Sequence, residues 1–197
     1  MERFDNWLYK YRFIIGGGVA LAIVGVAIYL TRKKKTILDK NKPTKGIIIG
    51  DSQTPFIAKQ TTKASLLGAK GGEENLWLGG MGLKWLKGAV DKYPVTQDVG
   101  NVVINIGTNG GFSKGDDIKG LLSSLKTKFP NASLFVVQGS WGWGGNKDVT
   151  QAKVDAYYNT FKPEATVLNP PIGVVKDPHG HLPIYKEIGK SIDNAIG

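Results

Sequence analysis

Short apolar runs alternate with segments whose apolar residues recur at helical spacing along residues 46–197. Buried strands are predicted where apolar residues cluster between turn residues, at 46–50 (GIIIG), 74–78, 101–106 (NVVINI), 133–138 (SLFVVQ) and 166–168. Helices are predicted where apolar residues recur at helical spacing, at 81–93, 116–129, 149–161 and 183–196. This alternation predicts an α/β domain with a mostly parallel sheet covered on both faces.

The N-terminal part has a different pattern. Residues 13–30 (FIIGGGVALAIVGVAIYL) contain no charged or strongly polar side chain. A helix rising about 1.5 Å per residue nearly crosses a ~30 Å hydrocarbon core over such a run. The basic TRKKK that follows does not resemble a signal-peptide cleavage site, and no polar face suits an interfacial helix. We therefore predict a 1–12 flank, a 13–30 transmembrane helix, a 31–45 basic tether and a 46–197 domain.

The distribution of charge predicts the orientation of that helix. Three lysines and arginines precede the predicted span and seven lie in residues 31–45. By the positive-inside rule, this bias places the C-terminal domain on the cytoplasmic side of a cellular membrane, or the equivalent side of a virion membrane. Tether lysines can also meet anionic headgroups, so the lipid bilayer is a predicted partner.

Composition narrows the possible chemistry. The chain has 197 residues and a net charge of +10, but ten of its basic residues lie in 1–45, against three acids. Residues 46–197 carry sixteen basic residues against thirteen acids, without a basic motif interleaved with aromatics, which argues against a nucleic-acid partner. The absence of cysteine excludes thiolate nucleophiles and disulfides.

Four loops carry candidate chemistry, because reacting groups gather beyond the carboxyl ends of parallel strands. A serine that follows a glycine turn can present its hydroxyl at the sheet edge, glycines can expose backbone N–H groups, and an asparagine amide can donate to an oxyanion. An aspartate near a histidine can orient the imidazole. The segments are Gly50-Asp51-Ser52-Gln53, Asn75–Gly80, Gly107-Thr108-Asn109-Gly110 and Asp177-Pro178-His179-Gly180-His181.

Each loop also has an ordinary interpretation. Gly-Asp-Ser can be a turn or a helix N-cap, the glycines can simply permit a helix start, and Asn-Gly is a common turn. Two histidines beside Asp177 could instead bind a metal. Only the order and spacing of all four loops favour a single site.

That order resembles the SGNH hydrolase (GDSL-like esterase) family over about residues 46–197. The resemblance implies a three-layer α/β/α flavodoxin-like fold and ester hydrolysis through an acyl-enzyme, with no metal or organic cofactor. Ser52 matches the nucleophile, and the oxyanion donors are Ser52, Gly80 (Gly79 in another register) and Asn109. Asp177 and His181 match the acid and the base.

The sequence departs from the family pattern twice. Gly110 stands where the family usually has aspartate, a residue outside the reacting groups. The family's Asp-x-x-His spacing is also missing, since histidines stand two and four residues after Asp177. His181 is favoured over His179, because a turn brings positions i and i+4 to one side and a helix start follows.

The substrate is less clearly encoded. Trp141 and Trp143 follow the fourth predicted strand, where their rings could line the substrate site or simply pack. The expected substrate is an ester of an acylated carbohydrate, with a lipid as the second choice. A catalytically silent SGNH-like binding or structural module, tethered to a cellular or viral membrane, is the alternative.

Overall fold

The computed structural model describes residues 45–169 and 182–196, which belong to one compact unit, Pro43–Gly197. Their order largely follows the predicted alternation of strands and helices. The elements are β1 (Lys45–Gly50), α2 (Thr54–Ala58), η1 (Glu73–Asn75), α3 (Leu83–Lys92), β2 (Val99–Asn105), α4 (Ile118–Lys128), β3 (Ser133–Val137), η2 (Gly144–Asn146), α5 (Gln151–Asn159), β4 (Thr166–Leu168) and α6 (Leu182–Ile196).

The four strands form one parallel sheet in the order β1-β2-β3-β4. In the register, Ile48 of β1 lies opposite Val103 of β2, and Val103 lies opposite Phe135 of β3. The run Ile47–Ile49 is completely buried. A strand buried on both faces needs apolar residues at consecutive positions, so the prediction of a parallel sheet is confirmed.

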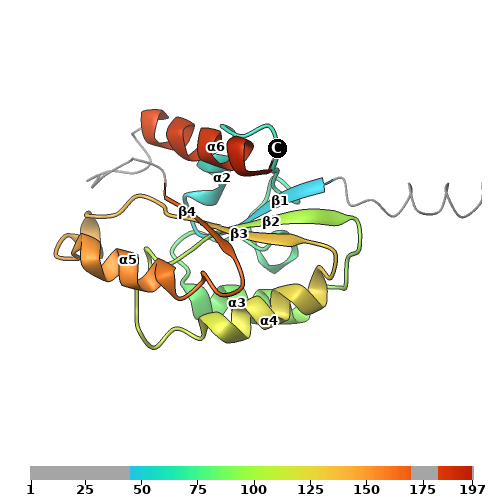
Figure 1. Ribbon diagram of the computed structural model, residues 1–197, viewed down its shortest axis with the longest axis horizontal. Coiled ribbons are helices and arrows are strands. Elements are labelled where there is room, and N and C mark those ends of the chain that lie inside the picture. The colour runs from blue at the N-terminus through green and yellow to red at the C-terminus, as the bar shows by residue number, and fades with distance from the viewer. Residues whose placement is uncertain (1–44, 170–181, 197) are drawn as a thin grey trace, which may run out of the picture. The chain divides into compact units, whose positions relative to one another are not determined.

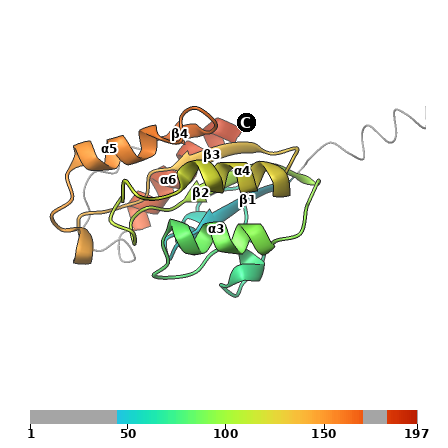
Figure 2. The same ribbon diagram turned by 90° about the horizontal axis from the view of Figure 1, so that it is seen from below.

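Helices cover both faces of the sheet, as Figure 1 shows. Ile47 and Ile49 point into a core cluster with residues of α3, α4 and α5, whereas Ile48 points into a second cluster with residues of α2 and α6. In Figure 2, α3 and α4 lie side by side over the sheet. This layered α/β arrangement is consistent with a flavodoxin-like fold.

The predicted strand at 74–78 is wrong. Residues 73–75 form a short 3-10 helix, and Leu76 has a left-handed backbone with φ of 53° that interrupts an extended chain. Two isolated parallel bridges, Ile47–Ser65 and Gly50–Trp77, remain at the outer edge of β1. In these bridges, Ile48 N–H donates to Ser65 O at 3.1 Å, and Gly50 N–H donates to Leu76 O at 2.9 Å. The edge position is therefore occupied, but by loop segments.

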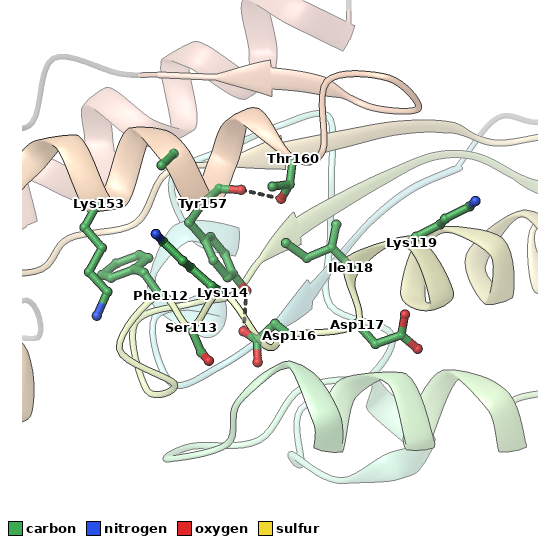
Figure 3. A pocket seen from close by; sticks show the side chains of 11 residues that line it. Phe112, Ser113, Lys114, Asp116, Asp117, Ile118, Lys119, Lys153, Tyr157 and Thr160 are labelled. Atoms are coloured by element: carbon green, nitrogen blue, oxygen red, sulfur yellow. Dashed lines mark hydrogen bonds between the residues drawn. The ribbon is translucent and has the colours of Figure 1, made fainter.

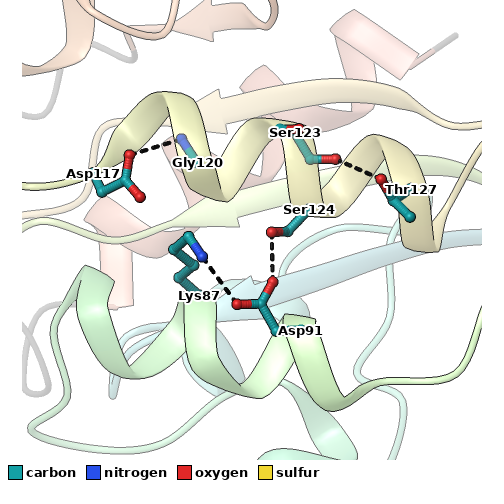
Figure 4. Close-up of polar contacts among 7 residues, drawn as sticks. All are labelled: Lys87, Asp91, Asp117, Gly120, Ser123, Ser124 and Thr127. Atoms are coloured by element: carbon teal, nitrogen blue, oxygen red, sulfur yellow. Dashed lines mark hydrogen bonds and ion pairs between the residues drawn. The ribbon is translucent and has the colours of Figure 1, made fainter.

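Polar contacts fix α4 beside α3 (Figure 4). The Asp117 side chain caps α4 by accepting from the Gly120 N–H at 2.9 Å, as N-cap aspartates do. Between the helices, Asp91 accepts hydrogen bonds from Lys87 and from the Ser124 hydroxyl, which lower its pKa.

The predicted transmembrane helix at 13–30 lies outside the described residues. Within residues 45–169 and 182–196, no helix combines the length and apolar character needed to cross a membrane. The span and the tether therefore stay predictions.

Candidate active site

Ser52 lies at the carboxyl edge of the sheet, where β1 ends and α2 has not yet begun. Gly50 has a φ of 142°, and a Cβ there would lie 1.8 Å from the backbone oxygen of Asn105, so only glycine fits. The Asp51 N–H then donates to that same oxygen at 3.1 Å, which ties the turn to the end of β2. The turn leaves Ser52 partly exposed. This placement gives the hydroxyl access to a substrate.

The Gly79–Gly80 turn lies against Ser52. It is anchored by Leu78, whose N–H donates to Gly50 O at 3.1 Å. A Cβ at Gly79 would lie 3.6 Å from the Ser52 Cβ, while Gly80, with φ of 77°, has no atom within 4 Å of its Cβ position. Within the described residues, the N–H groups of Ser52 and Gly80 make no hydrogen bond. Both remain available to receive an oxyanion.

Asn109 reaches the same turn from the loop that follows β2. Its side chain is exposed, and its Nδ2 donates to Met81 O at 3.2 Å. The two loops also touch through glycines, since a Cβ at Gly82 would lie 3.7 Å from the backbone of Gly110. One amide hydrogen of Asn109 is therefore used to join the loops, and the other is available for a ligand.

Three of the four predicted loops thus meet at one end of the sheet. Asp177, His179 and His181 lie outside the described residues, so their roles as acid, base or metal ligands stay predictions. The helix that follows them, α6, begins at the strands' carboxyl side (Figure 1). In its first turn Tyr185 stacks on Phe56 of α2, with ring centroids 5.5 Å apart. The chain therefore enters α6 near the segment that follows Ser52.

Beneath the site lies a buried polar network that no sequence motif predicts. Gln53 is its centre: its Oε1 accepts from the Ser140 N–H at 2.8 Å and from the Ser140 hydroxyl at 3.1 Å, and its Nε2 donates to Ser140 O at 3.0 Å. The same Nε2 donates to the Thr108 hydroxyl at 3.3 Å. Gln53 and Ser140 are 1% and 0% exposed. The network joins the loops that follow β1, β2 and β3.

Asp51 belongs to this buried layer. It is 1% exposed; its Oδ1 accepts from the Gln53 N–H at 3.0 Å, and its Oδ2 has no hydrogen-bond partner among the described residues. Burial raises the pKa of Asp51 to about 7, because the charged carboxylate loses its hydration, although the Gln53 N–H opposes the shift. The carboxyl group directly before Ser52 is therefore neutral in mildly acidic solution.

The two loop tryptophans have different environments. Trp141 is 3% exposed and packs in the core cluster under α3, α4 and α5. A ring buried to that extent cannot offer its face to a substrate, so the predicted substrate contact of Trp141 is not supported. Trp143 is partly exposed and stays a candidate.

Comparisons with known proteins bear on the fold. No protein-family model and no curated protein sequence matches the chain. A solved structure from Streptococcus pneumonia, named for platelet activating factor, is similar with a TM-score of 0.55 and 13% identity, over 90% of this chain and 99% of that chain. At such low identity, the likeness shows a shared fold.

Two family 2 carbohydrate esterases resemble the chain more weakly. The Clostridium thermocellum enzyme has a TM-score of 0.46 and 18% identity, over 79% of this chain and 64% of that chain. The Corynascus thermopiles enzyme, which carries a carbohydrate binding domain, has a TM-score of 0.47 and 16% identity, over 78% and 66%. Likenesses of this strength carry no functional argument.

Proposed function

We propose that the protein is a membrane-anchored serine esterase of the SGNH type. The observation that carries the proposal is the convergence of Ser52, the Gly79–Gly80 turn and Asn109 at the carboxyl edge of one parallel sheet. A partly exposed hydroxyl beside a side-chain amide and backbone N–H groups that no described residue accepts from is the arrangement that acyl transfer needs. The SGNH-like order of the motifs supports the same reaction.

The proposed mechanism has two steps. His181 removes the proton of the Ser52 hydroxyl as its oxygen attacks the ester carbonyl, and Asp177 stabilises the imidazolium. The N–H groups of Ser52 and Gly80 and the amide of Asn109 receive the oxyanion. The alcohol leaves with the proton from His181. Water, deprotonated by the same histidine, then releases the acid and regenerates Ser52.

Labelling with a fluorophosphonate probe tests this proposal on the detergent-solubilised chain. The native protein should be labelled and should hydrolyse p-nitrophenyl acetate. Ser52→Ala should show neither labelling nor hydrolysis. Ser133→Ala, an exposed serine at the start of β3, is the matched control and should behave as the native protein. Absence of labelling in the native protein would favour the silent binding module, and undiminished turnover by Ser52→Ala would refute the mechanism.

The base is tested by separate histidine variants. His181→Ala should reduce turnover nearly as much as Ser52→Ala, because members of a triad act as a unit. His179→Ala should cost less than about tenfold. If both variants and EDTA each abolish activity, the metal interpretation of the Asp177–His181 segment replaces the triad.

The proposed anchor places this chemistry at a membrane. We propose that residues 13–30 span the bilayer, with the domain on the cytoplasmic-equivalent side, and that the substrate is an acylated carbohydrate rather than a lipid. The full chain should remain with membranes through a carbonate wash. Release by carbonate or by high salt would show instead a peripheral association held by the basic tether.

A further inference from the structure

A groove runs from the Asn109 loop along α5. Its wider part has a volume of about 770 Å³ and is lined by residues that include Gly110, Gly111 and Ala152. A second part of about 440 Å³ continues toward Thr160. Both parts share Ser113, Lys114, Lys153 and Ala156, which makes them one continuous groove. Each volume lies in the range of about 300–1,000 Å³ typical of small-molecule sites.

The groove begins beside the candidate active site. Gly110 lines it and directly follows Asn109, whose amide is bonded to Met81 in the turn next to Ser52. A substrate whose ester carbonyl lay at Ser52 could therefore extend past Gly110 into the groove. The groove is suited to the portion of the substrate beyond the scissile bond.

Three lysines line the groove, and two of them, Lys114 and Lys153, line both of its parts. Lys114 and Lys153 are exposed and lie on the same side of Tyr157, near Phe112 (Figure 3). Neither makes an ion pair with a described residue. Lys153 also stands in the first turn of α5, whose partial positive charge adds to the attraction for an anion.

Two acids, Asp116 and Asp117, also line the groove, and each accepts a hydrogen bond within the protein. Asp116 Oδ2 accepts from the Tyr157 hydroxyl at 3.0 Å, and Asp117 Oδ1 accepts from the Gly120 N–H at 2.9 Å. Their charges weaken the field of the two lysines without pairing with either. Their remaining oxygens, with the Ser113 hydroxyl, can accept hydrogen bonds from hydroxyl groups of a ligand.

We infer that this groove binds an acidic carbohydrate, with Lys114 and Lys153 holding its carboxylate or phosphate groups. Ammonium groups attract the anion, and the nearby oxygen atoms suit sugar hydroxyls. The inference rests on the proposed esterase function, for which it specifies an anionic polysaccharide ester as the substrate class.

Direct binding tests the inference independently of catalysis. Oligogalacturonate, a phosphorylated oligosaccharide and a neutral oligosaccharide of equal length are titrated calorimetrically into the full chain carrying Ser52→Ala. At least one anionic ligand should bind several-fold more tightly than the neutral one, and the stronger of the two identifies the acidic group. Raising the salt concentration should reduce this preference, because exposed charges are screened.

Lysine variants locate the site. Exposed ion pairs contribute about 0.2–1 kcal/mol each, so Lys114→Met with Lys153→Met should raise the Kd of the anionic ligand about twofold to thirtyfold. The neutral ligand should be unaffected. Lys162→Met, an exposed lysine outside the groove lining, is the control and should change neither Kd.

The outcomes separate this inference from the esterase proposal. Equal affinity for neutral and anionic ligands, or an unchanged Kd in the double variant with native circular dichroism, would overturn the groove assignment. Binding that depends on both lysines in a protein that fluorophosphonate does not label would support the groove and refute the esterase.

Discussion

Replacing Gln53 with alanine should destabilise the protein because it empties the centre of the buried polar network. The Ser140 N–H, which donates to Gln53 at 2.8 Å, would lose its acceptor in a fully buried position. An unsatisfied buried group costs about 1–3 kcal/mol, and a lost neutral hydrogen bond contributes about 1 kcal/mol. Ser140 O keeps its bond from the Thr108 hydroxyl at 3.2 Å, which limits the damage. The expected loss is about 2–4 kcal/mol.

Urea unfolding of the full chain in detergent, followed by tryptophan fluorescence, measures this loss. With a slope of about 2 kcal/mol per molar, the midpoint should fall by about 1–2 M. Gln151→Ala is the matched control, since that glutamine is exposed on α5 and its side chain donates to the exposed Asp155; its effect should stay within about 0.5 kcal/mol. A loss below 1 kcal/mol for Gln53→Ala would show that the network does not stabilise the three loops.

Three further changes examine the same end of the sheet. Asn109→Ala should lower kcat by about 10²–10³ with little change in KM, as expected for an oxyanion donor; a pure KM effect would indicate ground-state binding instead. Because burial raises the pKa of Asp51 to about 7, the folded state holds a proton that the unfolded state releases. Stability should therefore fall as pH rises from about 4 to about 7. In Asp51→Asn the urea midpoints at pH 5 and pH 8 should therefore differ less than in the native protein. An equal difference in both proteins would contradict the raised pKa of Asp51. Gly139→Ala should cost about 1–3 kcal/mol in a thermal melt, because its Cβ would lie 2.7 Å from Asn105 Nδ2. Gly145→Ala, in open space nearby, should be neutral, and equal effects would refute the steric argument.

Most of the fold follows from local patterns. The Ile47–Ile49 run predicts a strand that is buried on both faces, and α4 ends just before Pro130, where a helix cannot easily continue. The misassigned strand at 74–78 ends in three apolar residues (LWL), but the left-handed Leu76 depends on packing that a short window does not reveal. Helix α2, with only five residues, is too short to show a helical period.

The part of the candidate site that lies at the ends of parallel strands was predictable from the sequence. Ser52 and Asn109 each follow a predicted strand that the structure contains, and the carboxyl ends of parallel strands bring such residues together. Gly80 follows a loop segment instead, which is held at the end of β1 by the bond from Leu78 N–H to Gly50 O. The Gln53–Ser140 network was not predictable, because it forms only when loops distant in sequence meet. The sequence gives a weak indication of the network, since Gln53 and Thr108 are polar residues of the Gly-Asp-Ser-Gln and Gly-Thr-Asn motifs.

The two edges of the sheet determine whether copies of this protein, concentrated on one membrane, can pair with one another through their strands. An open strand edge recruits strands from neighbouring chains. At one edge, however, the outward N–H groups of Ile48 and Gly50 already donate to Ser65 and Leu76 of the same chain. At the other edge, β4 offers a strand of only three residues. If the predicted helix concentrates the protein in a membrane, the described domain should remain resistant to aggregation by edge-to-edge pairing.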